Sequence, residues 1–338
     1  MRKKVVAFTL MISAFASCVK EDDKLTLPPP GELTKVVAEI GSDYNKQVYV
    51  SLANNKQVTR NIKDWDLAFE SSAAGFHVYL NSGKYMFTCH TGTNDFVISD
   101  TTGKPWMLDN DHLDDDSTAI GKWWENGVST DEVLVIDRGR VFYTGGSASQ
   151  RYKKLKLEAV TATEYHFSYC DFSNSTPVNF ILQKNNSYSL MYFSFDNGGK
   201  AVEIAPPKND WDVVFTRYTH TYFDQPLSSP FRYYLVSGAL SNRWNNISGI
   251  RLIKDSTPGY IDYAVINGVQ AANYVLSSNA DFIGFDWKVV DNSFHYLILT
   301  SRYYLLKDRY GYFYKIRFID FYNQAGQTGT ITFDYQRL

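Results

Sequence analysis

Cysteine is scarce in this sequence. Only three cysteines occur in 338 residues, and one of them, Cys18, lies in an N-terminal leader. So few cysteines exclude a disulfide-stapled scaffold and a zinc ribbon. Cys89 and Cys170 each lie in an apolar, strand-like stretch, where a cysteine is typically a small buried hydrophobe. We therefore expect both to be buried free thiols, with a disulfide between them as the alternative.

The sequence also lacks an excess of charge and any known catalytic motif. Its net charge is -2 and its lysines and arginines do not cluster, so nothing favours a nucleic-acid partner. It contains no Gly-x-Ser-x-Gly, His-Glu-x-x-His or P-loop pattern. The carboxylate pairs Asp64/Asp66 and Asp210/Asp212 resemble the acid/base pair of a glycosidase, but their occurrence twice favours a structural role. The sequence predicts a protein without catalytic activity.

No apolar run is long enough to span a bilayer. The leader has a basic start, a short apolar segment from Val5 to Phe15, and then Ala16-Ser17-Cys18. This pattern is typical of a bacterial lipoprotein signal, with an ordinary secretory signal as the alternative. We predict a signal peptide at 1–17, acylation of Cys18 and a tether at 18–35. The acidic run after Cys18 resembles an export signal for surface lipoproteins, which indicates a lipid-anchored protein on the outer membrane, exposed at the cell surface.

Aromatic residues, in contrast, are abundant: 25 tyrosines, 22 phenylalanines and 7 tryptophans. Aromatic side chains favour strands, so the composition predicts an all-β fold. Five short blocks also recur in the same order. They are 48–55 with 191–198, 64–69 with 210–215, 140–143 with 302–305, 154–157 with 315–318 and 164–169 with 330–335, at offsets of 143, 146, 162, 161 and 166. We interpret them as an internal duplication that gives two tandem β domains, at 36–173 and 188–338.

Between the repeated blocks lie variable regions that hold the candidate binding residues. The acidic stretch from Asp109 to Asp116 offers oxygen ligands for calcium, but it lacks the spacing of an EF-hand, and a solvated loop is the simpler interpretation. The second variable region contains two histidines, His220 and His295, and no methionine. The first contains His77, His90 and His112, together with Met86 and Met107.

The second repeat resembles the HmuY family of haem-binding surface lipoproteins. The resemblance rests on Tyr192-Phe193-Ser194-Phe195, on Asp210-Trp211-Asp212 with Arg217-Tyr218, on Ser301-Arg302-Tyr303-Tyr304, and on the ending from Lys315 to Tyr335. The lipoprotein leader is shared, and the first repeat matches more loosely. The resemblance implies two HmuY-like all-β units and capture of haem through two axial side chains, usually histidine and in some members methionine.

The family's axial ligands lie in the part of the chain where the resemblance is weakest, and none aligns with a residue here. His220 and His295 are the only axial candidates in the second variable region, so we predict that they bind the haem iron. The candidates in the first region come next. An outer-membrane receptor is a possible partner. The alternative function is a glycan-binding or adhesive surface protein that uses exposed tryptophans, namely Trp106, Trp123, Trp124 or Trp244.

Overall fold

The structure is a computed structural model that describes residues 30–98, 100–143, 148–226, 229 and 231–338. The predicted signal peptide, Cys18 and most of the tether lie outside these ranges. Within them, none of the helices has the length and hydrophobicity that a membrane span requires. Strands dominate, so the all-β fold predicted from the composition is confirmed.

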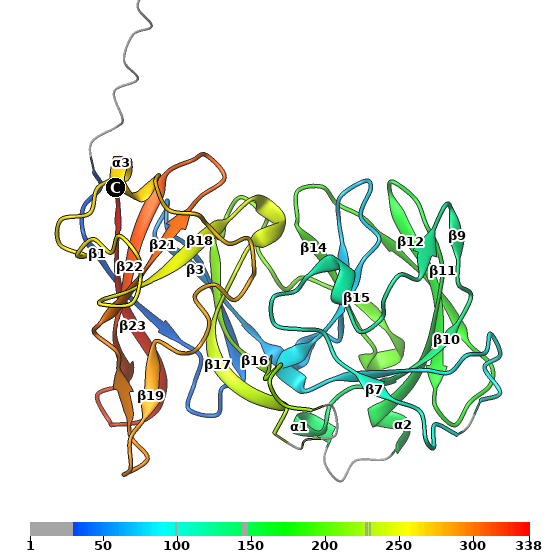
Figure 1. Ribbon diagram of the computed structural model, residues 1–338. Helices are drawn as coiled ribbons and strands as arrows, with labels where there is room; N and C mark the ends of the chain where they lie inside the picture. The colour runs from blue at the N-terminus through cyan, green and yellow to red at the C-terminus, as the bar shows by residue number, and fades with distance from the viewer. Residues whose placement is uncertain (1–29, 99, 144–147, 227–228, 230) are drawn as a thin grey trace, which may run out of the picture.

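Four antiparallel sheets stack as layers, which we name sheets A to D (Figure 1). In pairing order, sheet A contains β1 (Thr34–Glu39), β23 (Thr328–Arg337), β22 (Phe313–Tyr322), β21 (Arg302–Lys307) and β18 (Ser248–Ile253). Sheet B contains β17 (Tyr233–Ser241), β16 (Val213–Thr221), β2 (Lys46–Ser51) and β3 (Lys56–Asn61). These two sheets make the first sandwich.

The second sandwich is built from sheets C and D. Sheet C contains β15 (Lys200–Val202), β14 (Leu190–Ser194), β4 (Leu67–Glu70) and β5 (Val78–Leu80). Sheet D contains β13 (Val178–Gln183), β12 (Glu164–Asp171), β11 (Tyr152–Val160), β10 (Val133–Asp137), β6 (Phe87–His90) and β7 (Trp106–Met107). Cys89 and Cys170 lie in sheet D and are both free and buried, as predicted.

The remaining elements are short. Two ribbons pair β19 (Lys288–Val290) with β20 (Tyr296–Ile298) and β8 (Trp124–Glu125) with β9 (Val128–Ser129). The α-helices are α1 (Arg140–Tyr143), α2 (Ala148–Arg151) and α3 (Gly268–Ala271). The 3-10 turns are η1 (Ile62–Asp64), η2 (Ser82–Lys84), η3 (Asp115–Ser117), η4 (Asp196–Gly198) and η5 (Arg243–Asn245).

Three apolar cores lie between the four layers because the two inner sheets are buried on both faces. Along β16, Val213 and Phe215 face the core shared with sheet A, whereas Val214 faces the core shared with sheet C. Along β4, Leu67 and Phe69 face sheet D, and Ala68 faces sheet B. Side chains alternate between the two faces of a strand, so both faces of these strands must be apolar. The two sandwiches therefore share a continuous packed interior.

The two halves of the sequence do not pack as separate sets of sheets. β1 and β2 come from the first half, yet β1 pairs with β23 and β2 pairs with β16. Conversely, β14 from the second half pairs with β4. Figure 1 shows the blue N-terminal strands among the yellow-to-red C-terminal ones. The segments 36–173 and 188–338 are thus not self-contained packing units. β2 and β14 contain the matched blocks 48–55 and 191–198. The short turn η1 connects β3 of sheet B to β4 of sheet C.

The pairing registers agree with most of the sequence offsets. Val213 lies opposite Val50 in sheet B, and Leu67 lies opposite Phe193 in sheet C. In the outer sheets, Leu155 lies opposite Tyr169, as Ile316 lies opposite Tyr335. The four blocks concerned thus occupy corresponding places in the two sandwiches. Duplication as the origin of this likeness stays a prediction.

The match that we predicted for the third block, 140–143 with 302–305, is wrong. The segment 140–143 was expected to form a strand equivalent to β21, but it forms the short helix α1. Instead, β10 occupies the place that corresponds to β21: β10 pairs with β11, and β21 pairs with β22. It ends before Gly139, whose φ of +93° belongs to the region that favours glycine. A Cβ at Gly139 would lie 1.9 Å from the Lys84 carbonyl oxygen, so the chain must turn there and needs glycine to do so.

Candidate functional site

His220, near the end of β16 in sheet B, lines a cavity of about 490 Å³. The cavity is lined by residues from several elements, including His112, His220, Ile250, Asp281, Phe282 and Phe285. The volume lies within the range of small-molecule sites, and the lining combines apolar groups with a few polar ones, as such sites usually do. It is therefore the first place to look for ligand binding.

The His220 imidazole is positioned by a polar contact with a carboxylate and by packing against two aromatic rings. It lies near the end of β16, opposite Tyr234. Its Nδ1 contacts the carboxylate of Asp111, which is completely buried. The ring packs against Tyr222 at 4.6 Å and Phe285 at 4.8 Å between centroids. Within the part of the chain that the structure describes, Nε2 has no hydrogen-bond partner, so this nitrogen is available to a ligand.

His112 lies on the same cavity. Its Nδ1 is 2.6 Å from Oδ1 of Asp281, and its ring stacks on Phe223 at 6.0 Å. Burial alone would lower the pKa of His112, but the nearby charge of Asp281 raises it above its usual value. The backbone also ties the two loops together, because Ala280 N–H donates to the carbonyl of His112 at 3.0 Å.

The structure separates the two histidines that the sequence predicted as a pair. His295 lies in the turn before β20, is 69 % exposed and lies 3.8 Å from Asp291. It does not line the cavity that His220 lines. The strand that carries His220 pairs with β17 and β2, whereas β20, which follows His295, pairs with β19. The sequence did not specify which strands are neighbours, and ligation of haem iron by both histidines stays a prediction.

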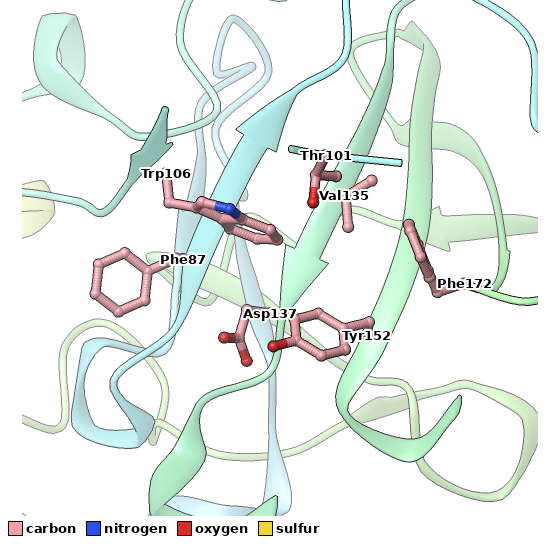
Figure 2. Close-up of a pocket in the computed structure, with 7 residues that line it drawn as sticks. All are labelled: Phe87, Thr101, Trp106, Val135, Asp137, Tyr152 and Phe172. Atoms are coloured by element: carbon pink, nitrogen blue, oxygen red, sulfur yellow. The ribbon is translucent and has the colours of Figure 1, made fainter. Parts of the chain in front are cut away.

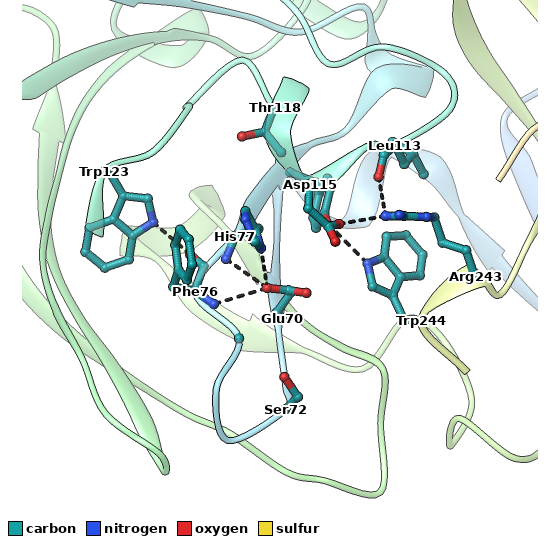
Figure 3. Close-up of polar contacts among 12 residues, drawn as sticks. Glu70, Ser72, Phe76, His77, Leu113, Asp115, Thr118, Trp123, Arg243 and Trp244 are labelled. Atoms are coloured by element: carbon teal, nitrogen blue, oxygen red, sulfur yellow. Dashed lines mark hydrogen bonds and ion pairs between the residues drawn. The ribbon is translucent and has the colours of Figure 1, made fainter. Parts of the chain in front are cut away.

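The candidates in the first variable region have structural partners. His90 uses both ring nitrogens, at 2.9 Å from Glu132 and 3.0 Å from the Ala119 carbonyl. His77 lies 2.6 Å from Glu70 (Figure 3). Met86 is buried in the core, and Met107 is partly exposed on β7. None of these four side chains lines the cavity around His220.

The acidic stretch is not merely a solvated loop, because two of its carboxylates have partners within the protein. Asp109 is buried and accepts N–H groups of Leu80 at 2.6 Å and Ala119 at 2.7 Å, while its burial raises its pKa to about 7. Asp115 accepts the hydroxyl of Tyr79 and contacts Arg243. Sequence reasoning missed that the middle of this stretch, Asp111 and His112, meets His220. The one available signal was a histidine among consecutive carboxylates.

Of the four tryptophans considered as sugar platforms, Trp106 lines an open cleft, and Trp244 lines a small cavity of about 70 Å³ between sheets B and C. Figure 2 shows this cleft on sheet D, where Trp106, Phe87, Tyr152 and Phe172 surround about 420 Å³. Trp123 is buried and donates to the Phe76 carbonyl at 2.7 Å. Trp124 packs beside it, and Trp244 packs on Tyr79 at 5.4 Å.

Comparison with known proteins gives a family match over most of the chain. The sequence model of the family described as HmuY protein matches residues 43–335. Apo PinO from Porphyromonas gingivitis is 10 % identical, with 91 % of this chain and 97 % of that chain covered and a TM-score of 0.35. The Tannerella forsythia apo HmuY analogue is 10 % identical, covers 92 % and 98 %, and has a TM-score of 0.29.

A third solved structure is described as a putative HmuY-like heme binding protein from Bacteroides vulgatus. It is 11 % identical, with 90 % of each chain covered and a TM-score of 0.22. No curated protein matches the sequence.

Proposed function

This chain belongs to the HmuY family, and on that premise we propose that it is a lipid-anchored surface protein that binds haem, without catalysis, in the cavity beside His220. The observation that carries this proposal is the state of the His220 imidazole. Its Nδ1 is fixed by a buried carboxylate, and its Nε2 has no partner in the described residues. A histidine that ligates iron usually has its second ring nitrogen held by a carboxylate in this way.

The surroundings of His220 suit a flat aromatic ligand. Phe282 and Phe285 line the cavity, and Phe223 is 58 % exposed next to His112. Apolar walls exclude water from a porphyrin, and a neutral imidazole supplies the axial nitrogen. Arg251 also lines the cavity and offers a cation, although its guanidinium already contacts Asp286. Haem is cargo in this proposal, and an outer-membrane receptor that takes it over is a proposed partner.

We expect His220→Ala to abolish the sharpened, shifted Soret band that the wild-type chain gives with ferric haem. The test is a hemin titration of the full chain, purified in detergent and treated with a chelator. His295→Ala is the matched control, since it removes an exposed imidazole outside the cavity, and it should bind like the wild type. Asp111→Asn should weaken binding about 10- to 100-fold, as loss of a group that orients a ligand does.

The same titration separates the alternatives. Loss of the band in His295→Ala would favour the histidine pair predicted from the sequence. No spectral change with the wild type would overturn haem binding, and the Trp106 cleft would then become the leading site. There, the carboxylate of Asp137, held by Arg151 at 2.6 Å, lies beside four aromatic rings that could stack on a glycan. A glycan array with wild type and Trp106→Ala tests that function.

The proposed anchor has its own test. An acyl chain contributes about 0.8 kcal/mol of membrane affinity per buried CH₂ group, so a chain with several acyl groups on Cys18 should stay bound. Cys18→Ala is expected to move the protein from the membrane pellet to the soluble fraction after cell fractionation. Retention of the variant in the pellet after a high-salt wash would contradict acylation of Cys18. Protease treatment of whole cells then reports surface exposure.

A further inference from the structure

We propose that Asp111, His112 and Asp281 form a binding site for a divalent transition-metal ion, with Zn²⁺ as the expected occupant. The three side chains come from loops far apart in the sequence, yet one ligand atom of each lies within 4.8 Å of the others. The proposal does not rest on haem binding, although Asp111, a member of this cluster, also contacts His220.

The strongest evidence is an oxygen of Asp111. This carboxylate has no exposed surface, and its Oδ2 contacts His220. Its Oδ1 is buried and has no hydrogen-bond partner among the residues that the structure describes. An unpaired buried carboxylate oxygen is energetically costly, because desolvation is not repaid by any donor. A cation held between Asp111 and its two neighbours would remove that cost.

The local charge balance supports a divalent ion. The Asp281 side chain is only 14 % exposed, and the Asp111 side chain has no exposed surface. Among the side chains that the structure describes, the imidazoles of His112 and His220 are the ones that contact the two carboxylates. The nearest arginine on the cavity, Arg251, is engaged by Asp286. One ion with two positive charges would therefore balance the two carboxylates.

The donor types select the metal. One imidazole nitrogen with two carboxylate oxygens is a set that zinc accepts, at about 2.0–2.2 Å per ligand, whereas calcium prefers six to eight oxygens. Three protein ligands leave a fourth position of a tetrahedral zinc ion open. His112 and Asp281 line the cavity, so this position would be accessible from it.

A second cluster of the same composition provides a comparison. Glu70, His77 and Asp115 also bring their ligand atoms within 4.8 Å of one another. Figure 3 shows that these carboxylates already have donors. Oε2 of Glu70 accepts the N–H groups of Phe76 at 3.1 Å and His77 at 3.0 Å, and Asp115 contacts Tyr79 and Arg243. Because Oε2 of Glu70 and Oδ1 of Asp115 already have donors, this cluster is expected to bind no metal.

The test is a calorimetric titration of the chelator-treated full chain, purified in detergent, with zinc chloride. We expect one equivalent of Zn²⁺ per chain, unaffected by excess Ca²⁺. Asp281→Asn and His112→Gln should each weaken zinc binding by more than about tenfold. Loss of a residue that only orients a metal ligand already lowers the affinity by about that factor, and each of these variants removes a ligand itself. Glu70→Gln, in the comparison cluster, should bind zinc like the wild type.

Cobalt gives a second readout that does not depend on heat. Co²⁺ in the wild-type site should show the visible absorption of a tetrahedral ion, and Asp281→Asn should lose it. Circular dichroism checks that each variant is folded. Asp281 and His112 are partly exposed, so they are safer to replace than the buried Asp111. Wild-type zinc affinity in both variants, or no zinc binding by the wild-type chain, would overturn the proposal whatever the outcome with hemin.

Discussion

Asp66→Asn is expected to lower the free energy of unfolding by about 3–5 kcal/mol, which is typical when one partner of a buried ion pair is removed. The Asp66 side chain is completely buried and contacts the ammonium of Lys84. Arg138 donates to both of its oxygens, at 3.0 and 2.8 Å, and the N–H of Phe195 donates at 2.8 Å. The variant would leave the Arg138 guanidinium with Asp196 as its remaining carboxylate partner, and the buried Lys84 ammonium would lose the carboxylate that it contacts. It would also loosen the contact between β4, β14 and the end of β10.

The ion pair also predicts a pH dependence. Burial would raise the pKa of Asp66, but Lys84 and Arg138 lower it below 3.8. The pKa of Lys84 is lowered by its burial and, to a smaller extent, by Arg138, although the charge of Asp66 opposes this. We therefore assign the stabilisation of the Asp66 carboxylate mainly to Arg138. A carboxyl with a lowered pKa in the folded state stabilises at pH values above its unfolded pKa, and that stabilisation is lost as the pH falls through the folded pKa. Asp66→Asn should therefore be less sensitive to acid than the wild type.

Asp212→Asn is the matched control, because Asp212 follows Trp211 as Asp66 follows Trp65. Asp212 accepts the N–H of Leu52 at 2.7 Å, but its nearest cation, Arg309, lies 3.8 Å away. Burial raises its pKa to about 6. A neutral residue should therefore be tolerated better there, with a loss of about 1–2 kcal/mol. Chemical denaturation of the three proteins measures the difference, and equal losses in the two variants would contradict the proposed role of Arg138.

Trp211→Ala is expected to cost about 3–5 kcal/mol of unfolding free energy, as truncation of a large buried aromatic side chain does. Trp211 is 2 % exposed in the core between sheets B and C, and its ring meets Tyr49 edge to face at 5.0 Å and 86°. Its Nε1 has no hydrogen-bond partner in the described residues. The loss therefore comes from the cavity that the substitution creates and from the lost ring contact.

Trp65→Ala is the control for this prediction. Trp65 makes the corresponding contact with Tyr192, at 5.0 Å and 81°, but it is only partly buried. Its replacement should therefore cost clearly less. Thermal or denaturant unfolding measures both variants, and limited proteolysis reports whether the two sandwiches separate. A larger loss for Trp65→Ala than for Trp211→Ala would show that the shared core is not centred on Trp211.

The sequence predicted those features that depend on local pattern. Alternating aromatic and polar residues indicated strands, and the offset of 146 between the Trp-Asp motifs placed Leu67 and Val213 at corresponding positions of their sheets. At the C-terminal end, two strand-like runs flank a turn with Gly326, and they pair as the hairpin of β22 and β23. These features could be predicted because side-chain alternation and turn residues act over a few neighbouring positions.

The sequence could not predict the neighbours of the candidate binding residues. Asp111 and Asp281 are separated by 170 positions, and His220 meets the first of them only because the acidic loop lies at the end of β16. His295 has the same residue type and the same variable region as His220, yet it lies in a different turn. A histidine has no periodic pattern that reveals its partner, so the candidate site required the positions of the loops.

By itself, then, the sequence determined that this chain is rich in strands and that it belongs to the HmuY family. Only the tertiary structure decided that β1 and β2 join the C-terminal strands and that β14 joins β4. The physical reason is that strands of similar pattern can hydrogen-bond equally well to several partners. The choice among them depends on loop lengths and on packing between layers, which are properties of the whole chain.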